Sequence, residues 1–349
     1  MRVLLTHPYG WPHVRRGAER ELHELAAHLV RSGVSAGILT GTPHGVTSRG
    51  LVDGVPVRYV RSPARPAWEA PGPAFAAIAA LGALRRVDLV HCLHYADAYG
   101  ASRSGRHPVV LKLTGTVLPE RMTGVDGRLL RGALRRADEV WCNSAWAAGQ
   151  MAGFGVAMRV VPAGVDAEVF RPGPPRAERP LVVCAAAAAA PRKRVTDLLA
   201  AWPAIRRELP GSRLVFAGQD APERLPEGST YVGALSDAAL AQLYARAWVV
   251  AAPAVHEALG LVTLEALACG TPVAGVRSGA TPDLLPPGTG ELAEPMDPAS
   301  LAQAVVRAAA LSERAQTRAA CLTASRPFTW DEVVPTVVGG YRRVLEARR

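Results

Sequence analysis

The chain of 349 residues lacks several features that would place it in a familiar class of protein. Its five cysteines are scattered without C-x-x-C spacing, so neither a disulfide framework nor a zinc site is indicated. No stretch approaches the roughly 20 apolar residues of a membrane span. The first residues, 1–8, have the pattern of a strand and are too short for a signal peptide. We therefore expect a cytoplasmic protein.

Common nucleotide and metal motifs are also missing. The chain has no G-x-G-x-x-G sequence and no Walker A sequence, which argues against NAD or ATP as a cofactor. It has no Asp-x-Asp pair, so a site that holds a metal between paired aspartates is not indicated. The sequence thus predicts neither a metal nor a cofactor.

Lysine is scarce, and the formal net charge of +10 comes almost wholly from arginine, because the only lysines are Lys112 and Lys193. Arg128, Arg131 and Arg135 would lie on one face of a helix, where they could contact an anionic lipid or polymer. A solvated helix face is the simpler alternative. No aromatic residues alternate with these arginines, so a nucleic-acid partner is not indicated.

Strand-like and helical stretches alternate through both halves of the chain, as in open parallel sheets. The predicted strands are 2–6, 35–40, 89–92, 109–114, 139–143, 181–185, 213–217, 231–232 and 248–252, and the predicted helices are 18–31, 195–208 and 237–246. The alanine run 185–190 either extends a helix or lines a tight turn. The length suits two domains of roughly 100–200 residues each.

The predicted fold class is therefore α/β, with two doubly wound, Rossmann-like domains that face a central cleft. The expected divisions are residues 1–170, a proline-rich linker at 171–180, a second domain at 181–325 and a C-terminal segment at 326–349. In such sheets ligands bind at the carboxyl ends of the strands, so the site is expected there.

The segment 253–273 carries the clearest chemical pattern. Glu257 lies in a loop after an apolar strand, Gly260 allows a close backbone approach, and a helix from about Leu261 carries Glu265. The N-terminus of that helix suits a diphosphate, and the carboxylates suit sugar hydroxyls. The pattern indicates a sugar-nucleotide site, although two glutamates this close also occur by chance on surface helices.

A series of further motifs agrees with this interpretation in type and order. They are Gly17-Ala-Glu19, Asp88-Leu-Val-His91, Asn143-Ser144, the run from Val161 to Pro172, Phe216-Ala-Gly218, Val232-Gly233, Leu240 with Tyr244, and Phe328-Thr-Trp330. Over nearly its full length, the chain resembles the family 4 retaining glycosyltransferases, which have the GT-B fold. The resemblance implies that residues 1–170 form the acceptor side, that residues 181–325 bind the nucleotide sugar, and that a C-terminal helix at 326–349 crosses back to the first domain.

The resemblance implies roles for individual residues. Glu257 would contact the hydroxyls of a donor sugar, Glu265 the ribose of its nucleotide, and Lys193 the departing diphosphate. The other implied donor contacts are Arg16, Gly17, Arg192, Gly233 and the loop amides of Ala258, Leu259, Gly260, Leu261 and Val262. No metal is implied at the donor site.

The chain also departs from the family pattern. Ala188 stands where the family usually has an arginine, so the second cation for the diphosphate is either missing or supplied by Arg192 or Arg194. Arg16 replaces the first glycine of the N-terminal loop.

On the acceptor side, Thr114 replaces a histidine expected near the donor sugar. His91 and His94 either contact the acceptor or are packed strand-end histidines. The acceptor surface is expected in the loops 42–50, 62–74 and 94–107.

The leading hypothesis is a retaining, metal-independent transferase of EC class 2.4 that moves a sugar from a nucleotide-diphosphate sugar to an acceptor hydroxyl. The acceptor is a polysaccharide, a glycolipid or a natural product, and the nucleotide base and the sugar stay open. The alternative is a catalytically weakened protein that binds nucleotide sugars as a partner subunit. A third interpretation keeps the chemistry but places the acceptor in a membrane lipid, with the arginines at 128–135 in peripheral contact with the inner membrane face.

Overall fold

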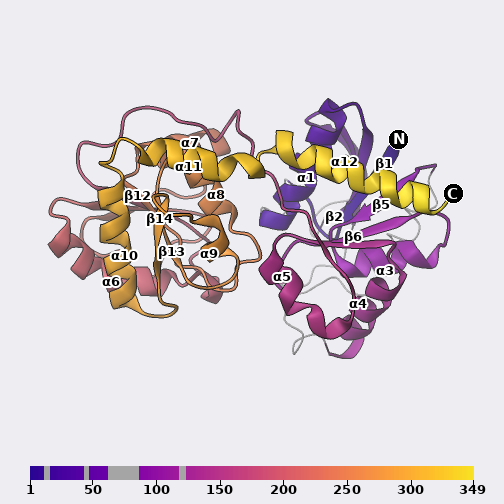
Figure 1. The fold of residues 1–349 in the computed structure, drawn as a ribbon, viewed down its shortest axis with the longest axis horizontal. Helices are drawn as coiled ribbons and strands as arrows, with labels where there is room; N and C mark the ends of the chain where they lie inside the picture. The colour runs from indigo at the N-terminus through magenta and orange to yellow at the C-terminus, as the bar shows by residue number, and fades with distance from the viewer. Residues whose placement is uncertain (12–15, 43–46, 62–85, 118–122) are drawn as a thin grey trace. The chain divides into compact units, whose positions relative to one another are not determined.

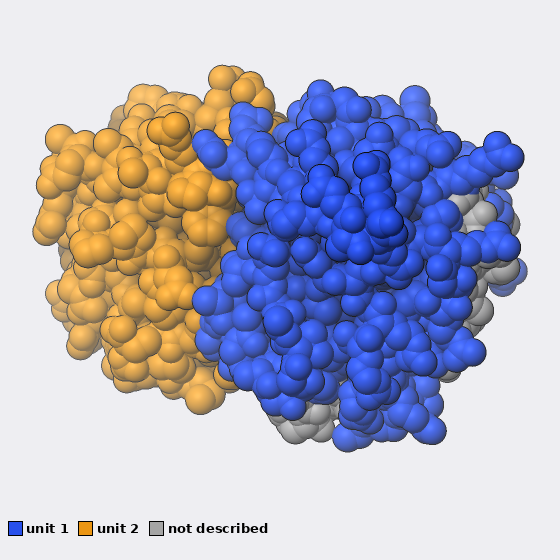
Figure 2. Space-filling model, turned by 45° about the vertical axis from the view of Figure 1, so that its right-hand side comes forward, with its two compact units in different colours: residues 1–164, 330–349 blue, residues 165–329 orange. Residues whose placement is uncertain are grey.

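A computed structural model describes residues 1–11, 16–42, 47–61, 86–117 and 123–349, which form two compact units. Unit 1 comprises Met1–Gly164 and Trp330–Arg349, and unit 2 comprises Val165–Thr329 (Figure 2). All five cysteines are free and buried. Among the described helices, none has the length and apolar character needed to cross a bilayer.

The described strands of unit 1 form one sheet in the order β3-β4-β2-β1-β5-β6-β7-β8, in which only β3 and β4 are antiparallel neighbours. The strands are β1 (Arg2–His7), β2 (Ser35–Thr42), β3 (Ser48–Val52), β4 (Val55–Arg61), β5 (Leu89–Cys92), β6 (Val109–Leu113), β7 (Glu139–Cys142) and β8 (Arg159–Val160). The helices are α1 (Gly17–Arg31), α3 (Tyr95–Arg103), α4 (Gly124–Arg136), α5 (Ala145–Gln150), the short η2 (Ala152–Phe154) and α12 (Trp330–Ala347).

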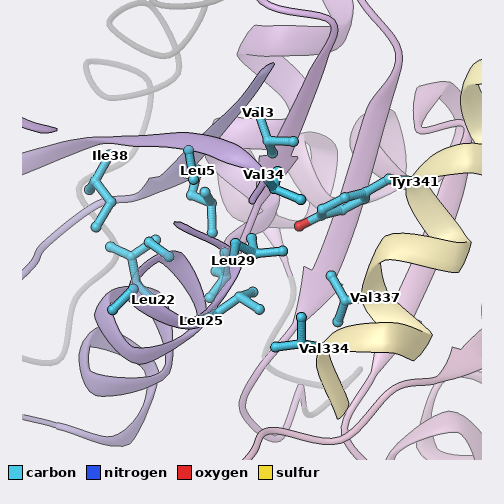
Figure 3. Packing of buried hydrophobic residues seen from close by; sticks show 14 of the residues in the cluster. Val3, Leu5, Leu22, Leu25, Leu29, Val34, Ile38, Val334, Val337 and Tyr341 are labelled. Carbon is cyan, nitrogen blue, oxygen red and sulfur yellow. The ribbon is translucent and has the colours of Figure 1, made fainter. Parts of the chain in front are cut away.

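Two layers of helices cover the sheet of unit 1. Helices α1 and α12 lie on one face, and α3 and α4 lie on the other (Figure 1). Successive strand residues point to opposite faces, so Val110 joins the core under α1 and α12 while Leu111 joins the core under α3 and α4. Leu22 of α1 and Val337 of α12 pack in the first core, which Figure 3 shows. Burying such a side chain contributes roughly 1.5–3 kcal/mol.

The strands of unit 2 form a parallel sheet in the order β11-β10-β9-β12-β13-β14. They are β9 (Leu181–Ala185), β10 (Arg213–Ala217), β11 (Ser229–Tyr231), β12 (Val249–Ala251), β13 (Val273–Val276) and β14 (Gly290–Ala293). The helices are α6 (Val195–Glu208), α7 (Asp237–Arg246), α8 (Leu261–Ala268), α9 (Thr281–Leu284), α10 (Pro298–Leu311), α11 (Thr317–Ser325) and the short η3 (Pro191–Lys193) and η4 (Arg326–Phe328). This is the strand order of a Rossmann fold. Successive strands are added on one side of β9 as far as β11 and on the other side from β12 onwards, so the strand order reverses between β9 and β12.

The α/β fold class with two parallel-sheet domains is confirmed, and most predicted elements end within two residues of the observed ones. The hairpin β3–β4 was not predicted. Asp53 and Gly54 form its two-residue turn with positive φ angles of 50° and 77°, as Asp-Gly turns do. Of the predicted acceptor loops, residues 48–50 lie in β3 and 95–103 lie in α3, while 43–46 and 62–74 lie outside the described residues.

The proline-rich stretch 171–180, which the sequence predicts as a linker, belongs to unit 2. The amide of Ala177 donates to the carbonyl of Arg246, and the Trp248 indole N–H donates to the carbonyl of Ala177 at 2.7 Å. The boundaries between the units fall instead at Gly164/Val165 and Thr329/Trp330. Prolines stop the helix and sheet patterns here, but the hydrogen bonds still hold the segment to unit 2.

Candidate active site

In unit 2, a lysine and a glutamate with complementary charges meet where the strand order reverses. Lys193 ends the short helix that follows β9, and Glu257 lies in the loop that follows β12. Because β9 and β12 are parallel neighbours, their carboxyl ends meet, which brings together two residues 64 positions apart. Lys193 Nζ donates to Glu257 Oε1 at 2.7 Å, and Arg192 Nη1 donates to the same oxygen at 2.7 Å.

The two cations keep Glu257 ionised. Burial alone would raise the pKa of this carboxyl group. The charges of Lys193 and Arg192 and their hydrogen bonds outweigh that effect and lower the pKa below its usual value. Both bonds end on Oε1, and no bond to Oε2 is found among the described residues, so Oε2 can accept from a ligand hydroxyl.

Backbone contacts fix the loop that carries Glu257. The Val255 amide donates to the carbonyl of Arg192, and the Ala280 amide donates to the carbonyl of Glu257, each at 2.9 Å. Gly279 has a φ of 66°, and a Cβ there would lie 2.4 Å from the Glu257 carbonyl oxygen. Position 279 therefore requires glycine both for its backbone conformation and for the close approach of the two loops.

Helix α8 begins directly after this loop. Gly260 caps it with a φ of 103°, and the first described bond of the helix runs from the Leu264 amide to the Gly260 carbonyl at 3.2 Å. The amides before Leu264 in the first turn have no acceptor within the helix, which suits an anion. The predicted loop amides belong to Ala258 and Leu259, whose side chains are buried, and to Gly260, Leu261 and Val262, which are half-buried.

Glu265 has a different partner from Glu257. It lies in the middle of α8 with 3% of its surface exposed, and the Tyr244 hydroxyl donates to its Oε2 at 3.4 Å. Gly233 follows the edge strand β11, and its carbonyl accepts from the Gly218 amide at 3.0 Å. Glu257 therefore pairs with two cations, whereas Glu265 accepts a hydrogen bond from a tyrosine of α7.

Arg192 and Arg194, the two candidates for the arginine that is missing at position 188, have different partners. Arg194 donates through Nε and Nη2 to Asp197 at 2.9 and 2.7 Å, whereas Arg192 lies with Lys193 on Glu257. The alanine run around Ala188 forms a turn, so the alternative of a helix extension is wrong.

In unit 1, the predicted donor contacts lie at the start of α1. Arg16 caps the helix and donates to Glu19 Oε1 through Nε at 3.1 Å. Arg16 and Gly17 are exposed. Thr114 follows β6, is half-buried, and accepts from the Asn143 side-chain amide at its carbonyl oxygen at 2.9 Å.

Of the two alternatives for His91, the structure has the packed strand-end histidine. The side chain is fully buried, and its Nδ1 is 2.6 Å from the Tyr341 hydroxyl of α12. Its ring packs edge-on against Trp141. His91 is thus a packed core residue because it points into the core under α12, whereas His94 is half-buried, caps α3 and accepts from the Ala96 amide at 3.2 Å.

A buried ion pair beneath this edge of unit 1 was not predicted. Lys112 Nζ lies 2.5 Å from Glu21 Oε1, with both side chains at most 2% exposed. Lys112 also donates to the Pro162 carbonyl at 3.1 Å, and Asn143 Nδ2 donates to Glu21 Oε2 at 3.4 Å. A lysine is rarely buried without a partner. The position of Lys112 inside an apolar strand was therefore the only feature of the sequence that could have indicated this ion pair.

The predicted arginine stripe lies on α4. Arg128, Arg131 and Arg135 are exposed, and none has an ion pair with another described residue. Val125, at the start of the same helix, is 47% exposed. The helix therefore presents positive charge to its surroundings.

Two family models match adjacent stretches of the chain. The model described as Glycosyltransferase Family 4 matches residues 15–169, and the model described as Glycosyl transferases group 1 matches residues 179–310. The chain belongs to glycosyltransferase family 4. The stretches that these models match include both the N-terminal loop at Gly17 and the pair of Lys193 and Glu257.

Curated relatives in this family include the D-inositol 3-phosphate glycosyltransferase of Mycobacterium avium (strain 104). It is 36% identical over 213 residues, which are 53% of this chain and 49% of the relative. The chain thus matches about half the length of the relative.

Solved structures show the GT-B fold for this family 4 chain. A sucrose-phosphate synthase from Thermosynechococcus elongatus has a TM-score of 0.80 and 21% identity, covering 99% of both chains. Anabaena Alr3699/HepE in complex with UDP-glucose has a TM-score of 0.74 and 19% identity, covering 98% of this chain and 100% of the other.

Proposed function

We propose that this protein is a retaining, metal-independent glycosyltransferase that moves a sugar from a nucleotide-diphosphate sugar to an acceptor hydroxyl. The observation that carries the proposal is the pair of cations on Glu257, beside the N-terminus of α8. Membership of family 4 supports it.

Lys193 and Arg192 would stabilise the departing diphosphate. Cleavage of the bond between sugar and phosphate leaves negative charge on the phosphate oxygens. Fixed cations and helix amides stabilise that charge more in the transition state than in the ground state. These groups would supply the positive charge that a metal supplies in other transferases, which is why we propose a metal-independent reaction.

Glu257 would orient the donor sugar, and Glu265 would bind the ribose. Oε2 of Glu257 can accept from a sugar hydroxyl while Oε1 keeps the cations in place. For Glu265 to accept from a ribose, either its hydrogen bond with Tyr244 must lengthen or the carboxylate must accept from the Tyr244 hydroxyl and the ribose together. Retention follows from the family resemblance, in which a donor phosphate oxygen takes the acceptor proton on the face that the leaving group occupied.

The test is calorimetry and hydrolysis with UDP-, GDP-, ADP- and dTDP-sugars in the absence of metal. UDP-glucose is the first donor because Alr3699/HepE binds it, and D-inositol 3-phosphate is the first acceptor because the relative's name contains it. We expect binding and slow hydrolysis that Lys193→Ala and Glu265→Ala abolish and that Arg194→Ala retains. Failure of every donor to bind would contradict the proposal. Binding without hydrolysis or transfer would favour the partner-subunit alternative.

We further propose that the exposed arginines of α4 hold the enzyme at an anionic membrane surface. The exposed positions Arg128, Arg131 and Arg135, with Val125 beside them, support this proposal. The double variant Arg131→Glu, Arg135→Glu should lose most binding to vesicles that contain anionic phospholipid. Arg213→Glu, at an exposed position in unit 2, is the matched control. Equal binding of both variants would contradict membrane contact.

A further inference from the structure

A hollow of about 640 Å³ lies in unit 2, among residues that precede the strands. Trp248 stands before β12, and Ala177 stands before β9. The proposed donor site lies at the carboxyl ends of these strands, so the two sites are at opposite ends of one sheet. The hollow is largely open to solvent.

Arg176 forms one wall of the hollow. Its Nη2 donates to the carbonyl of Gly270, just after α8, at 2.9 Å, and its Nη1 donates to the carbonyl of Ser312, just after α10. The guanidinium group therefore lies at the negative ends of two helices, which accounts for its position. Its Nε is buried and has no hydrogen-bond partner among the described residues.

Arg318 of α11 lines the same hollow. Its side chain passes so close to Gly270 that a Cβ there would lie 2.7 Å from the Arg318 Cγ. Burial, and then the charge of Arg318, lowers the pKa of Arg176. Glu313 also lines the hollow, but neither arginine has an ion pair with a described carboxylate.

We propose that this hollow binds a small molecule that carries a phosphate group, with hydrogen bonds from Arg318 to the phosphate and the positive charge of Arg176 beside it. Guanidinium groups bind phosphate through paired charge-assisted hydrogen bonds, and an anion would remove the repulsion between the two arginines. Trp248 and Pro175 offer flat apolar surfaces for a ring attached to the phosphate. A sugar phosphate has this chemistry. The proposal is independent of the donor chemistry proposed above.

Calorimetry of the full chain with inorganic phosphate and with glucose 6-phosphate tests the site. Arg318→Ala should weaken binding of both probes by about tenfold or more, because the phosphate would lose its charge-assisted hydrogen bonds to the guanidinium group. Arg314→Ala, which removes an exposed arginine outside the lining, should bind as the wild type does. Lys193→Ala should keep the binding that Arg318→Ala weakens, and only phosphate bound at the proposed donor site should be lost in that variant.

The opposite pattern, with binding lost in Lys193→Ala and kept in Arg318→Ala, would overturn the proposal and place the phosphate at the donor site. Absence of binding by the wild-type protein would also overturn it. A second measurement needs no variant: phosphate should slow the modification of Arg318 by phenylglyoxal, read by mass spectrometry, and leave Arg314 unprotected. Equal rates at Arg318 with and without phosphate would contradict the site.

Discussion

Arg192 and Arg194 flank Lys193 but have different partners, and this difference predicts their effects on catalysis. Arg192→Ala removes a cation from Glu257 and should lower kcat/KM for the donor by about 10- to 100-fold, the equivalent of one charge-assisted bond. Arg194→Ala breaks only a local pair with Asp197 and should change kcat/KM by less than about threefold. Steady-state kinetics of both variants check this. Equal losses would show that the pairing with Glu257 has no bearing on turnover.

Gly279 supports the site through its lack of a side chain. Gly279→Ala would force a Cβ against the Glu257 backbone at a φ of 66°, so the loop must shift. We expect a weaker donor affinity together with a loss of roughly 1–3 kcal/mol in the free energy of unfolding. Thermal melts and donor titrations measure the two effects. Gly288→Ala, with a φ of 87° but no neighbour within 4 Å of the new Cβ, controls for backbone strain alone.

At the scale of elements, α12 depends on a polar contact within an apolar interface. Tyr341→Phe would leave Nδ1 of the buried His91 without its partner, which should cost about 1–3 kcal/mol of unfolding free energy. Tyr99→Phe, whose hydroxyl accepts from the exposed Arg103, should cost no more than about 0.5 kcal/mol. Denaturant unfolding compares the two variants. A similar small loss in both would mean that apolar packing alone holds α12.

For the molecule as a whole, unit 1 should be the acid-sensitive part. Burial lowers the pKa of four of its histidines, to about 4 for His23 and about 3 for His94, with His7 and His91 also lowered. The unfolded chain binds these protons near pH 6.5, so this stability is fully present above pH 6.5 and is lost as the pH falls. Asp97 acts oppositely, since burial raises its pKa.

Between its folded and its unfolded pKa, each such group changes the unfolding free energy by about 1.4 kcal/mol per pH unit. His23 and His94, with pKa values of about 4 and about 3, contribute through the whole range from pH 6.5 to 5 and together outweigh the one aspartate. Hydrogen exchange at pH 7 and pH 5, corrected for the intrinsic rate, should show unit 1 losing more protection than unit 2. His23→Gln should reduce the difference, and His256→Gln, at an exposed position of unit 2, should not. A uniform loss across both units would contradict this account.

The sequence by itself determined the helices and strands, and it also showed which strands are followed by charged residues of the candidate site. Periodicity and turn residues act over a few positions, so β5, β9, α6 and α7 follow from local pattern with the bounds that the structure has. The positions of Glu257 after one strand and Lys193 after another were visible for the same reason.

Only the tertiary structure decided which of these residues meet. The order of strands places β9 beside β12, and this order, rather than any local pattern, joins Lys193 to Glu257. Burial of His91 likewise depends on α12, because its hydrogen-bond partner in that helix, Tyr341, lies 250 positions later in the chain. Contacts at such separations arise from packing of whole elements, and no short stretch of sequence specifies that packing.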